Sequence, residues 1–422
     1  MPVLLRYPAT VRIRRLLLLT QYFEPEVGAP QVRLASFVSE LTKRGIEVEV
    51  VTALPNHPEG RIQPAYRRRA AVTERRHGAV VRRVWMLAAS GAGLRRMLSY
   101  LSFTATSVLG IVRCRRPDVI VVESPPPFLF LPARMAGLLW RRPVLFNVAD
   151  LWPDSALKLG LLRDGPVVRL LLWFESWVYR RSSGVIAVTE GLRQVLTGEK
   201  GVPPEKVSFL PNGVDTELFA PRPPDEATGR RYAPGRERVI VYAGTVGFAH
   251  GVEVAVDAMA LVAPRHPDAK LLIVGAGSGL AAVEARIARH PEANVELVPP
   301  VQPDEVARLY NVAVAGLSTL RDSELFEGTR PSKVFPVMAS GKPVLYSGAG
   351  EGARLVEEHG VGIVCPPEDA PALAEAICRV LEDDVAARDM GERGRKLAMS
   401  EFSWEALIDS WLTQLGWEPP AS

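Results

Sequence analysis

The sequence predicts an α/β protein that contains two doubly wound, Rossmann-like domains. Short apolar runs rich in β-branched residues alternate with longer amphipathic stretches along the whole chain. Runs of this kind are typical of parallel strands that are buried on both faces by helices. A length of 422 residues exceeds what a single core usually supports, which favours two domains. Ligands of such sheets bind beyond the carboxyl ends of the strands, so we expect a cleft between the domains.

The expected strands form two series, separated by a Pro- and Gly-rich polar segment at 221–235 whose composition is typical of a linker. We therefore assign a first domain to residues 1–215, a linker to 216–235 and a second domain to 236–400. A C-terminal helix in 401–422 can pack back on the first domain. The first series comprises Arg15–Thr20, Glu47–Thr52, Val80–Trp85, Asp118–Val122, Val144–Val148, Val185–Val188 and Val207–Leu210. The second comprises Arg238–Ala243, Lys270–Val274, Val295–Val298, Val312–Leu317, Val344–Tyr346 and Gly362–Cys365.

Charge is distributed unevenly along the chain. Residues 1–200 contain 30 Lys and Arg against 15 Asp and Glu, whereas the remainder contains 21 against 32. The N-terminal half should therefore be attracted to anionic surfaces. Nucleic acid is not the expected partner, because the basic residues do not interleave with aromatic residues as in a base-stacking platform. An anionic membrane surface is the better prediction.

The apolar run Met97–Val112 is flanked by arginines and is predicted to be a helix. Its 16 residues would extend only ~24 Å, short of the ~30 Å hydrocarbon core, and it contains several Ser and Thr. It could lie on a bilayer or be buried in the protein, and we favour the buried helix. The three cysteines form no CxxC pair and no secretory signal is evident, which predicts a cytoplasmic protein, peripheral at the inner membrane face.

The segment Arg330–Leu345 places a basic pair, Arg330 and Lys333, at the start of a predicted helix. A helix N-terminus offers unpaired N–H groups and a positive dipole end, so a phosphate can bind there with Ser332. Lysine adds a point charge suited to phosphate. A capped helix with solvated cations explains the same residues equally well. The proline at position 336 would also remove a helical N–H.

Glycine-rich loops follow several of the expected strands. Such loops permit close approach of the backbone to a ligand, although each is equally consistent with an ordinary strand-to-helix turn. A dinucleotide fingerprint is not favoured, because its third glycine is replaced by Leu280. The candidate anion-facing residues in and after these loops are Gly28, Arg33, Gly244, Gly247, His250, Gly275 and Gly277.

Carboxylates follow the strand Val144–Val148 at Asp150 and Asp154. Asp150 lies directly at the carboxyl end and is the preferred catalytic or substrate-orienting acid, the alternative being a helix cap. His57, between two prolines, is either a fixed loop residue or an acceptor contact. No DxD pair is present to hold a divalent metal on a diphosphate, so no metal site is predicted.

Together these segments resemble the retaining nucleotide-sugar glycosyltransferases of family 4, which have the two-domain GT-B fold. The motifs occur in the same order over nearly the whole chain: GAPQVR at Gly28–Arg33, DLWPDS at Asp150–Ser155, PNGVD at Pro211–Asp215, the YAG and GAGSG loops, and PSK at Pro331–Lys333. The combination looks most like the subgroup that adds amino- or deoxysugars to lipid-linked precursors of bacterial surface polysaccharides, such as O-antigen, colanic acid or capsule.

The resemblance implies a UDP- or GDP-type sugar donor, a glycan or polyprenyl-diphosphate-linked acceptor, and no cofactor or metal. Lys333, Ser332 and Arg330 would bind the donor diphosphate with Gly28 and Arg33, while the loops at Gly244–His250 and Gly275–Gly279 would line the nucleotide side. Asp150 and Lys333 are the implied catalytic residues, and His57 and Glu123 would lie on the acceptor side. Retention by front-face attack would need no strong enzymic nucleophile.

The sequence departs from this family at several positions. Pro336 stands where many relatives have a glutamate that holds the ribose, and Gly328 stands at the first glutamate position, with Glu327 and Glu324 out of register. Thr245 and His250 replace the usual Arg and Lys of the first loop of the second domain, and Ala149 replaces a histidine. Two alternatives therefore remain, a nucleotide-sugar epimerase of the same fold and a non-catalytic nucleotide-sugar-binding scaffold.

Overall fold

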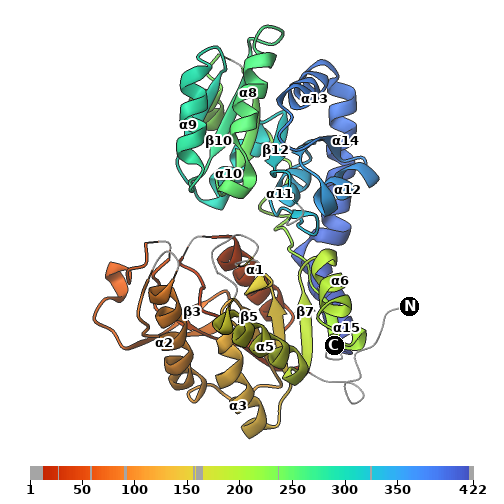
Figure 1. The fold of residues 1–422 in the computed structure, drawn as a ribbon. Coiled ribbons are helices and arrows are strands. Elements are labelled where there is room, and N and C mark those ends of the chain that lie inside the picture. The colour runs from red at the N-terminus through yellow and green to blue at the C-terminus, as the bar shows by residue number, and fades with distance from the viewer. Residues whose placement is uncertain are drawn as a thin grey trace. The chain divides into compact units, whose positions relative to one another are not determined.

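The computed structural model describes residues 13–417 except 27, 58, 90–92, 155, 156, 158–164, 236, 324 and 325, and only the backbone of Ala29 and Leu94. Ser155 and Glu324 of the motifs above lie outside the described residues. The chain divides into two compact units (Figure 1). Unit 1 comprises Met1–Asn212 and Leu407–Ser422, and unit 2 comprises Gly213–Ala406.

Unit 1 is built on an eight-stranded sheet in which every pairing is parallel except that of β3 with β4. Its central strand β1 is buried on both faces of the sheet. Within the sheet, Leu18 of β1 lies opposite Val50 of one neighbouring strand and Val121 of the other. The strands run in the order β3 (Ala71–Arg76), β4 (Ala79–Val84), β2 (Glu47–Ala53), β1 (Arg15–Leu19), β5 (Val119–Ser124), β6 (Val144–Val148), β7 (Gly184–Ala187) and β8 (Val207–Phe209).

The edge strand β3 was not predicted from the sequence. It forms a hairpin with β4 through His77 and Gly78, whose positive φ angles of 48° and 77° suit a tight two-residue turn. Its side chains are exposed or half-buried because it lies at the edge of the sheet, so it lacks the apolar run that marks the other strands. The His-Gly pair between two charged, alternating segments was the available signal.

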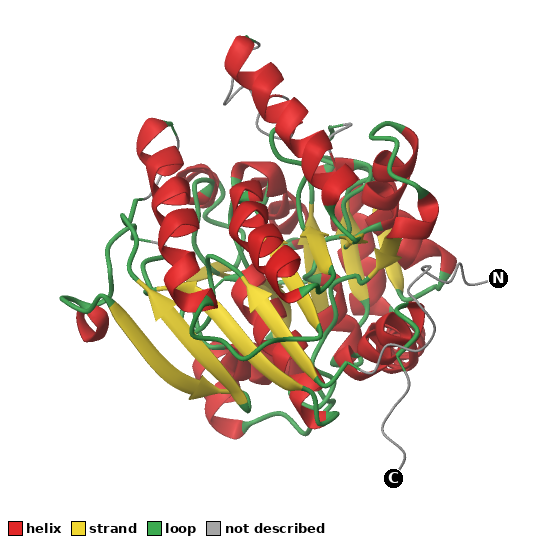
Figure 2. Ribbon diagram, turned by 90° about the horizontal axis from the view of Figure 1, so that it is seen from below, coloured by secondary structure: helices red, strands yellow, loops and turns green. Residues whose placement is uncertain are grey.

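Helices cover both faces of the unit 1 sheet, as the red helices around the yellow strands show in Figure 2. On one face the core cluster joins Leu17 and Leu19 to residues of four helices, α2 (Leu94–Ile111), α3 (Phe130–Trp140), α5 (Pro166–Arg181) and α6 (Glu190–Gly198). The other face carries α1 (Ala29–Lys43) and most of α15 (Trp404–Gln414), with the rings of Phe37 and Trp411 5.5 Å apart.

Most of helix α15 packs within unit 1. Trp411 is fully buried and its indole N–H donates to the hydroxyl of Ser208 at 3.3 Å. The side chain of Gln414 accepts from the backbone N–H of Phe209 at 2.8 Å and donates to its carbonyl at 3.1 Å. These residues therefore complete the hydrogen bonding of β8, the last strand of the sheet.

The interpretation of Met97–Val112 as a buried helix is wrong for half of its surface. The inward side of α2 is buried at Ser99, Phe103 and Ile111, but Leu101 and Leu109 on the outward side are 45% and 54% exposed. The sheet can cover only one side of a helix that is apolar all round, so the other side stays partly exposed.

Unit 2 contains a six-stranded, fully parallel sheet. The strands run in the order β11 (Val295–Val298), β10 (Ala269–Val274), β9 (Arg238–Ala243), β12 (Ala315–Thr319), β13 (Val344–Ser347) and β14 (Gly362–Cys365). One face is covered by α8 (Glu253–Val262), α9 (Leu280–Arg289) and α13 (Ala370–Glu382). The other is covered by α7 (Glu226–Tyr232), α10 (Pro303–Val312), α11 (Val334–Ala339), α12 (Gly350–Glu358) and α14 (Asp384–Leu397).

The strand predictions agree closely with the structure, with one exception. The expected strand Val312–Leu317 begins too early, because α10 continues to Val312 and β12 starts only at Ala315. The segment interpreted as a linker is also part of a folded unit. It contains α7, whose Tyr232 is 2% exposed and donates from its hydroxyl to Glu305 Oε1 at 3.1 Å.

Candidate active site

Two glycine loops of unit 2 lie in direct backbone contact at the carboxyl ends of β9 and β10. A Cβ on Gly275 would lie 1.9 Å from the carbonyl oxygen of Gly244, and one on Gly277 would lie 2.2 Å from that of Val246. Both residues have positive φ, 147° and 157°. Hydrogen bonds join the two loops, including Val246 N–H to Ala276 O at 3.0 Å. The glycines that were expected to face phosphate therefore have a structural role, the close approach of these loops.

Lys333 extends from the residue before α11 to the first of these loops. A Cβ on Gly244 would lie 2.6 Å from Lys333 Cε, and the ammonium nitrogen is 5.3 Å from the centroid of the Tyr242 ring. Burial lowers the pKa of Lys333 to about 8. Among the described residues no carboxylate pairs with this ammonium. A desolvated cation without a partner is unfavourable, so the site is suited to an anionic ligand.

His250 lies near this lysine, at the end of the short 3₁₀ helix Phe248–His250. Its Nδ1 accepts from the backbone N–H of Gly247 at 3.3 Å. Burial, with a smaller contribution from the charge of Lys333, lowers the pKa of His250 to about 4. The ring is therefore neutral at pH 7, and because Nδ1 acts as acceptor the proton resides on Nε2. Lys333 and His250 thus present two hydrogen-bond donors.

The other basic residue of the PSK segment is engaged within unit 2. Arg330 Nη2 lies 2.6 Å from Glu351 Oε1, and the guanidinium is 5.6 Å from the centroid of the Phe402 ring. Its charge is thus compensated before any ligand arrives. Ser332 is exposed in the turn that precedes Lys333. Of the two cations at the start of this segment, Lys333 is the one without an ion-pair partner among the described residues.

Pro336 costs the helix no hydrogen bond, contrary to expectation. It is the third residue of α11, which begins at Val334, and an N–H at that position has no partner four residues earlier within the helix. Its carbonyl accepts from the N–H of Ser340 at 3.0 Å, as in a regular helix. The proline is therefore compatible with the helix, although it offers no carboxylate to a ribose.

In unit 1 two predicted site residues pair with each other. Arg33 on α1 forms a salt bridge through Nη2 with Glu123 Oε1 at the end of β5, and the two residues are only 8% and 5% exposed. Asn147 Nδ2 donates to the other carboxylate oxygen at 2.5 Å. The guanidinium expected at the donor diphosphate and the carboxylate expected on the acceptor side therefore neutralise each other in one buried network.

Gly28 is the residue before α1 and provides space for a neighbouring side chain. A Cβ at this position would lie 2.5 Å from Gln31 Oε1. That amide oxygen is buried and has no hydrogen-bond donor among the described residues, and the same holds for Asn147 Oδ1. Buried amide oxygens without a donor are suited to accept from the hydroxyl groups of a sugar.

Glu26 positions the loop that carries His57, and sequence reasoning missed it. Its Oε1 accepts from the backbone N–H groups of Asn56 and His57, each at 2.7 Å, and burial raises its pKa. The ring of His57 lies 5.3 Å from that of Tyr22, and burial together with the charge of Arg96 lowers its pKa. The segment after the first strand carries two carboxylates, Glu24 and Glu26, and nothing in their spacing indicates which of them contacts this loop.

The two carboxylates after β6 have different surroundings. Asp154 forms an ion pair with Lys200, whose ammonium also lies 2.8 Å from Glu175 Oε2. Asp150 is exposed at the carboxyl end of the strand, and its carbonyl accepts from the N–H of Trp152 at 3.1 Å. Asp154 is therefore a structural anchor, and Asp150 is the carboxylate that can reach a ligand.

Both halves of the chain match glycosyltransferase family models. The glycosyl transferase 4-like domain matches residues 28–213, and the glycosyl transferases group 1 domain matches residues 237–383. The chain is a GT-B glycosyltransferase of the family 4-like type. The predictions of a glycosyltransferase and of its fold class are thereby confirmed, whereas the subgroup that transfers amino- or deoxysugars stays a prediction.

Relatives and solved structures match this glycosyltransferase over most of its length. The Escherichia coli (strain K12) protein named "Putative colanic acid biosynthesis glycosyl transferase WcaI" is 26% identical over 391 residues, 88% of this chain and 94% of its own. Sucrose-phosphate synthase from Thermosynechococcus elongatus has the same fold, with a TM-score of 0.71, 20% identity and coverage of 95% and 99%. Anabaena HepE in complex with UDP has a TM-score of 0.70, 18% identity and coverage of 95% and 99%.

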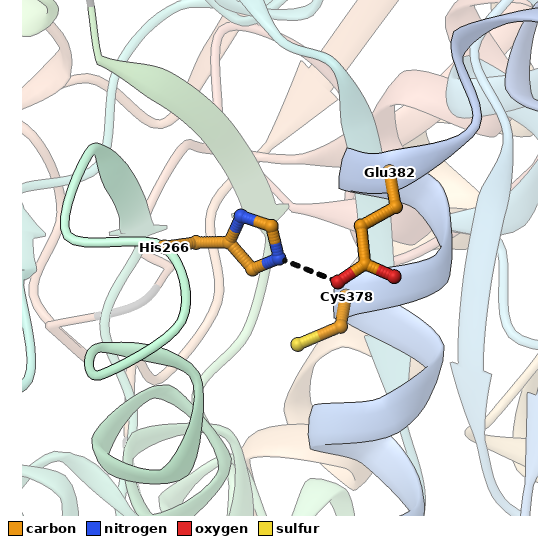
Figure 3. Close-up of side chains that lie close together, drawn as sticks. All are labelled: His266, Cys378 and Glu382. Atoms are coloured by element: carbon orange, nitrogen blue, oxygen red, sulfur yellow. Dashed lines mark hydrogen bonds and ion pairs between the residues drawn. The ribbon is translucent and has the colours of Figure 1, made fainter.

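Figure 3 shows one group of possible metal ligands in the described part of this glycosyltransferase. It does not include any residue of the glycine loops after β9 and β10. His266, Cys378 and Glu382 have ligand atoms within 4.8 Å of one another. However, Arg265 donates to Glu382 Oε1 at 2.8 Å, and Arg238 Nη2 lies 3.3 Å from His266 Nδ1. With both ring nitrogens and the carboxylate engaged beside two guanidiniums, the group is better described as an ion-pair network than as a metal site.

Proposed function

We propose that this glycosyltransferase transfers a sugar, with retention, from a nucleoside-diphosphate donor to a glycan acceptor in cell-surface polysaccharide synthesis. The observation that carries the proposal is the partly buried ammonium of Lys333, which lies beside the Gly244 loop with no carboxylate partner among the described residues. Such a site favours a compact anion, and the diphosphate of a sugar nucleotide is the anion that the family uses.

The chemistry of the leaving group explains why these residues would accelerate transfer. Cleavage of the glycosidic bond leaves negative charge on the nucleoside diphosphate, and donors already aimed at that charge lower the barrier. The ammonium of Lys333 and the Nε2–H of neutral His250 are such donors. Both side chains already lie beside the Gly244–Gly247 loop, and donors in place before the reaction need little reorganisation.

In unit 1 we propose that Asp150 orients the acceptor hydroxyl or the donor sugar, with His57 on the acceptor side. Front-face attack by the acceptor requires no enzymic nucleophile. The partnerless amide oxygens of Gln31 and Asn147 would accept from sugar hydroxyls. Arg33 and Glu123 would support these amide groups as a neutral pair instead of contacting the diphosphate or the acceptor directly.

The chemical class of the substrates is proposed from the charge of the chain and from its relatives. The donor would be of the UDP or GDP type, consistent with the complex of HepE with UDP. The acceptor would be a glycan on a polyprenyl diphosphate, and the sugar an amino- or deoxyhexose, consistent with the colanic acid pathway in the name of WcaI. The excess of basic residues in 1–200 supports work at the cytoplasmic face of an anionic membrane.

The test compares Lys333→Ala with Lys342→Ala, a second partly buried lysine of the same segment that lies beyond the other end of α11. Purified protein is incubated with UDP-, GDP- and dTDP-sugars and a polyprenyl-diphosphate-linked glycan. We expect Lys333→Ala to lower turnover by about 100- to 1,000-fold with the fold retained, and Lys342→Ala to retain turnover. Unchanged turnover in Lys333→Ala would contradict the proposal.

The same donor panel separates the alternatives. Thermal stabilisation by a nucleotide sugar followed by transfer to the acceptor supports the transferase. Conversion of the donor to its epimer without transfer would indicate the epimerase. Absence of stabilisation by every donor would favour the scaffold.

A further inference from the structure

Three neighbouring helices of unit 1 each leave large apolar side chains exposed. Helices α2, α3 and α5 lie next to one another on the same face of the sheet (Figure 1). Helix α3 contacts α2, and its Phe130 ring lies 5.7 Å from Trp177 on α5. Most of the exposed large apolar side chains in the described part of the chain belong to these helices or directly follow them.

Helix α3 shows the pattern most clearly. Its inward side is buried at Phe130, Ala133 and Ala136. Its outward side carries Met135, Leu138 and Leu139, which are 66%, 60% and 80% exposed. The helix is thus apolar on both sides, although only one side has a partner within the unit.

The helices on either side of α3 continue this surface. On α5 the exposed side chains are Val167, Leu170 and Trp173, spaced by three residues so that they follow one side of the helix. On α2 the outward stripe consists of Leu98, Leu101, Val108 and Leu109, followed by Val112. We call this surface, made by the outward side chains of the three helices, the α2–α3–α5 face. Exposed large apolar side chains gathered on three neighbouring helices are typical of an interaction surface.

The charged side chains that the three helices themselves expose are of one sign. The single carboxylate in the three helices is Glu175, which is 2% exposed and bonded to Lys200 and Tyr179. Arg142, just beyond α3, pairs with Asp118. Six other arginines in or directly beside these helices have no carboxylate partner among the described residues: Arg95, Arg134, Arg141, Arg169, Arg180 and Arg181. The occupant of the face should therefore be apolar in the middle and anionic around the rim.

We propose that the α2–α3–α5 face docks this glycosyltransferase on the surface of an anionic lipid bilayer. In the described residues no helix is long and apolar enough to cross a membrane. The three helices instead lie in the interface, with leucines, Met135 and Trp173 among the acyl chains and the arginines at the headgroups. This docking surface rests on the proposed function in one respect only, namely that the acceptor is presented at the membrane.

A second copy of the chain fits this face less well than a bilayer. A two-fold dimer would place the same surface of each copy against the other. The arginines would then face arginines, with no carboxylate on these helices to pair with them. Anionic headgroups supply the missing negative charge, and the acyl chains cover the apolar centre.

The test measures co-sedimentation of the full chain with lipid vesicles in the absence of sugar donor. One set of vesicles is phosphatidylcholine alone and the other contains about 30% phosphatidylglycerol. The test variant combines Leu139→Gln with Trp173→Gln. The matched control combines Leu261→Gln with Val385→Gln in unit 2, where these side chains are 51% and 68% exposed. All four positions are at the surface, so neither variant creates a cavity.

We expect the native chain and the control to bind the anionic vesicles, and the test variant to bind at least about tenfold more weakly. The double variant Arg134→Gln with Arg169→Gln should bind anionic vesicles more weakly, and its binding should depend less on salt concentration. Equal binding by the native chain and the Leu139/Trp173 variant would overturn the proposal. The proposal would also be overturned if the native chain forms a dimer that the Leu139/Trp173 variant dissociates, and neither protein binds vesicles.

The outcome can be separated from that of the proposed function. Thermal stabilisation by a nucleotide sugar depends on Lys333 in unit 2 and not on this face. A variant that still binds the donor but no longer binds vesicles would support the docking surface. In Lys333→Ala, loss of donor binding with vesicle binding intact would support the proposed function without bearing on the docking surface.

Discussion

The carboxyl ends of the two sheets differ in whether their buried basic residues are paired with carboxylates. In unit 1 the guanidinium of Arg33 is paired with Glu123 in a buried network, so its charge holds α1 against β5. In unit 2 the ammonium of Lys333 is also desolvated but lacks a carboxylate among the described residues. The first end is internally neutral and suited to neutral sugar groups, whereas the second is suited to an anion.

The lowered pKa of Lys333 indicates how much the unpaired ammonium destabilises the folded protein when no ligand is bound. A decrease from 10.5 to about 8 corresponds to roughly 3 kcal/mol of destabilisation of the charged form. Because the pKa is lower in the folded state, this destabilisation is complete below pH 8 and disappears as the pH rises from about 8 to 10.5. A bound diphosphate would remove the same penalty at neutral pH.

The largest expected effect contrasts the two cations directly. Arg33→Met should lower the free energy of unfolding by about 3–5 kcal/mol, because it leaves the buried carboxylate of Glu123 without its partner. Lys333→Met should raise it by about 1–3 kcal/mol, because it removes a desolvated charge. Denaturant unfolding of both variants provides the measurement.

A double variant sharpens this contrast. Arg33→Met combined with Glu123→Leu removes both charges of the pair and should recover part of the lost stability. If Arg33→Met and Lys333→Met shift stability in the same direction and by similar amounts, the distinction between a paired and an unpaired cation is wrong.

The next effect separates the two aspartates of the loop after β6. Asp150→Asn should lower turnover by about 10- to 100-fold with little change in stability, because we place its carboxylate at the substrates. Asp154→Asn should instead lower the melting temperature, since it breaks the ion pair with Lys200, and leave turnover largely intact. Steady-state kinetics and thermal unfolding of both variants distinguish these roles, and a reversed pattern would show that the anchor and the orienting acid are exchanged.

The pH dependence of donor binding should follow Lys333. A nucleoside diphosphate binds the ammonium form, and a free-protein pKa of about 8 leaves that form in the minority at pH 9. The affinity for UDP or GDP should therefore fall about tenfold between pH 7 and pH 9, with proton uptake on binding at pH 8. Calorimetry in buffers of different ionisation enthalpy measures both quantities. Lys333→Met, which cannot titrate, should abolish the dependence, and its persistence in that variant would assign it to another group.

The smallest expected effect is at Pro336. Pro336→Ala should change the free energy of unfolding by less than about 0.5 kcal/mol, because the proline lies in the first turn of α11 and displaces no hydrogen bond. Pro336→Glu restores the carboxylate of many relatives at the same position. If it tightens donor binding while Pro336→Ala does not, the ribose is recognised at this position when a carboxylate is present.

The sequence was sufficient to predict most of the secondary structure of both units. Strands such as Val144–Val148 and Arg238–Ala243 are short, mostly apolar runs, and a run of this kind is typical of a parallel strand buried on both faces. The edge strand β3 escaped because exposure at an edge removes the apolar pattern. The end of α10 was misplaced because Val312 is apolar and fits a strand as well as a helix.

The candidate site was only partly predictable for a different reason. The sequence identifies which groups could carry charge, and Lys333, His250 and Asp150 were among them. It does not tell which charges meet. Arg33 and Glu123 are 90 residues apart, and Asp154 reaches Lys200 from another element, so their pairing follows from the packing of strands and helices. Glu26, which follows β1, likewise holds the loop at Asn56 and His57, which follows the neighbouring strand β2 about 30 residues later.

The sequence by itself therefore determined the two α/β units, the order of their motifs and the basic character of the N-terminal half. These properties are local or additive, so they can be read from runs and counts of residues. Only the tertiary structure decided that Arg33 and Arg330 are neutralised while Lys333 is not, and that the apolar residues of α2, α3 and α5 face outward. The availability of a charge or an apolar side depends on what the fold brings against it, and that is fixed by long-range packing.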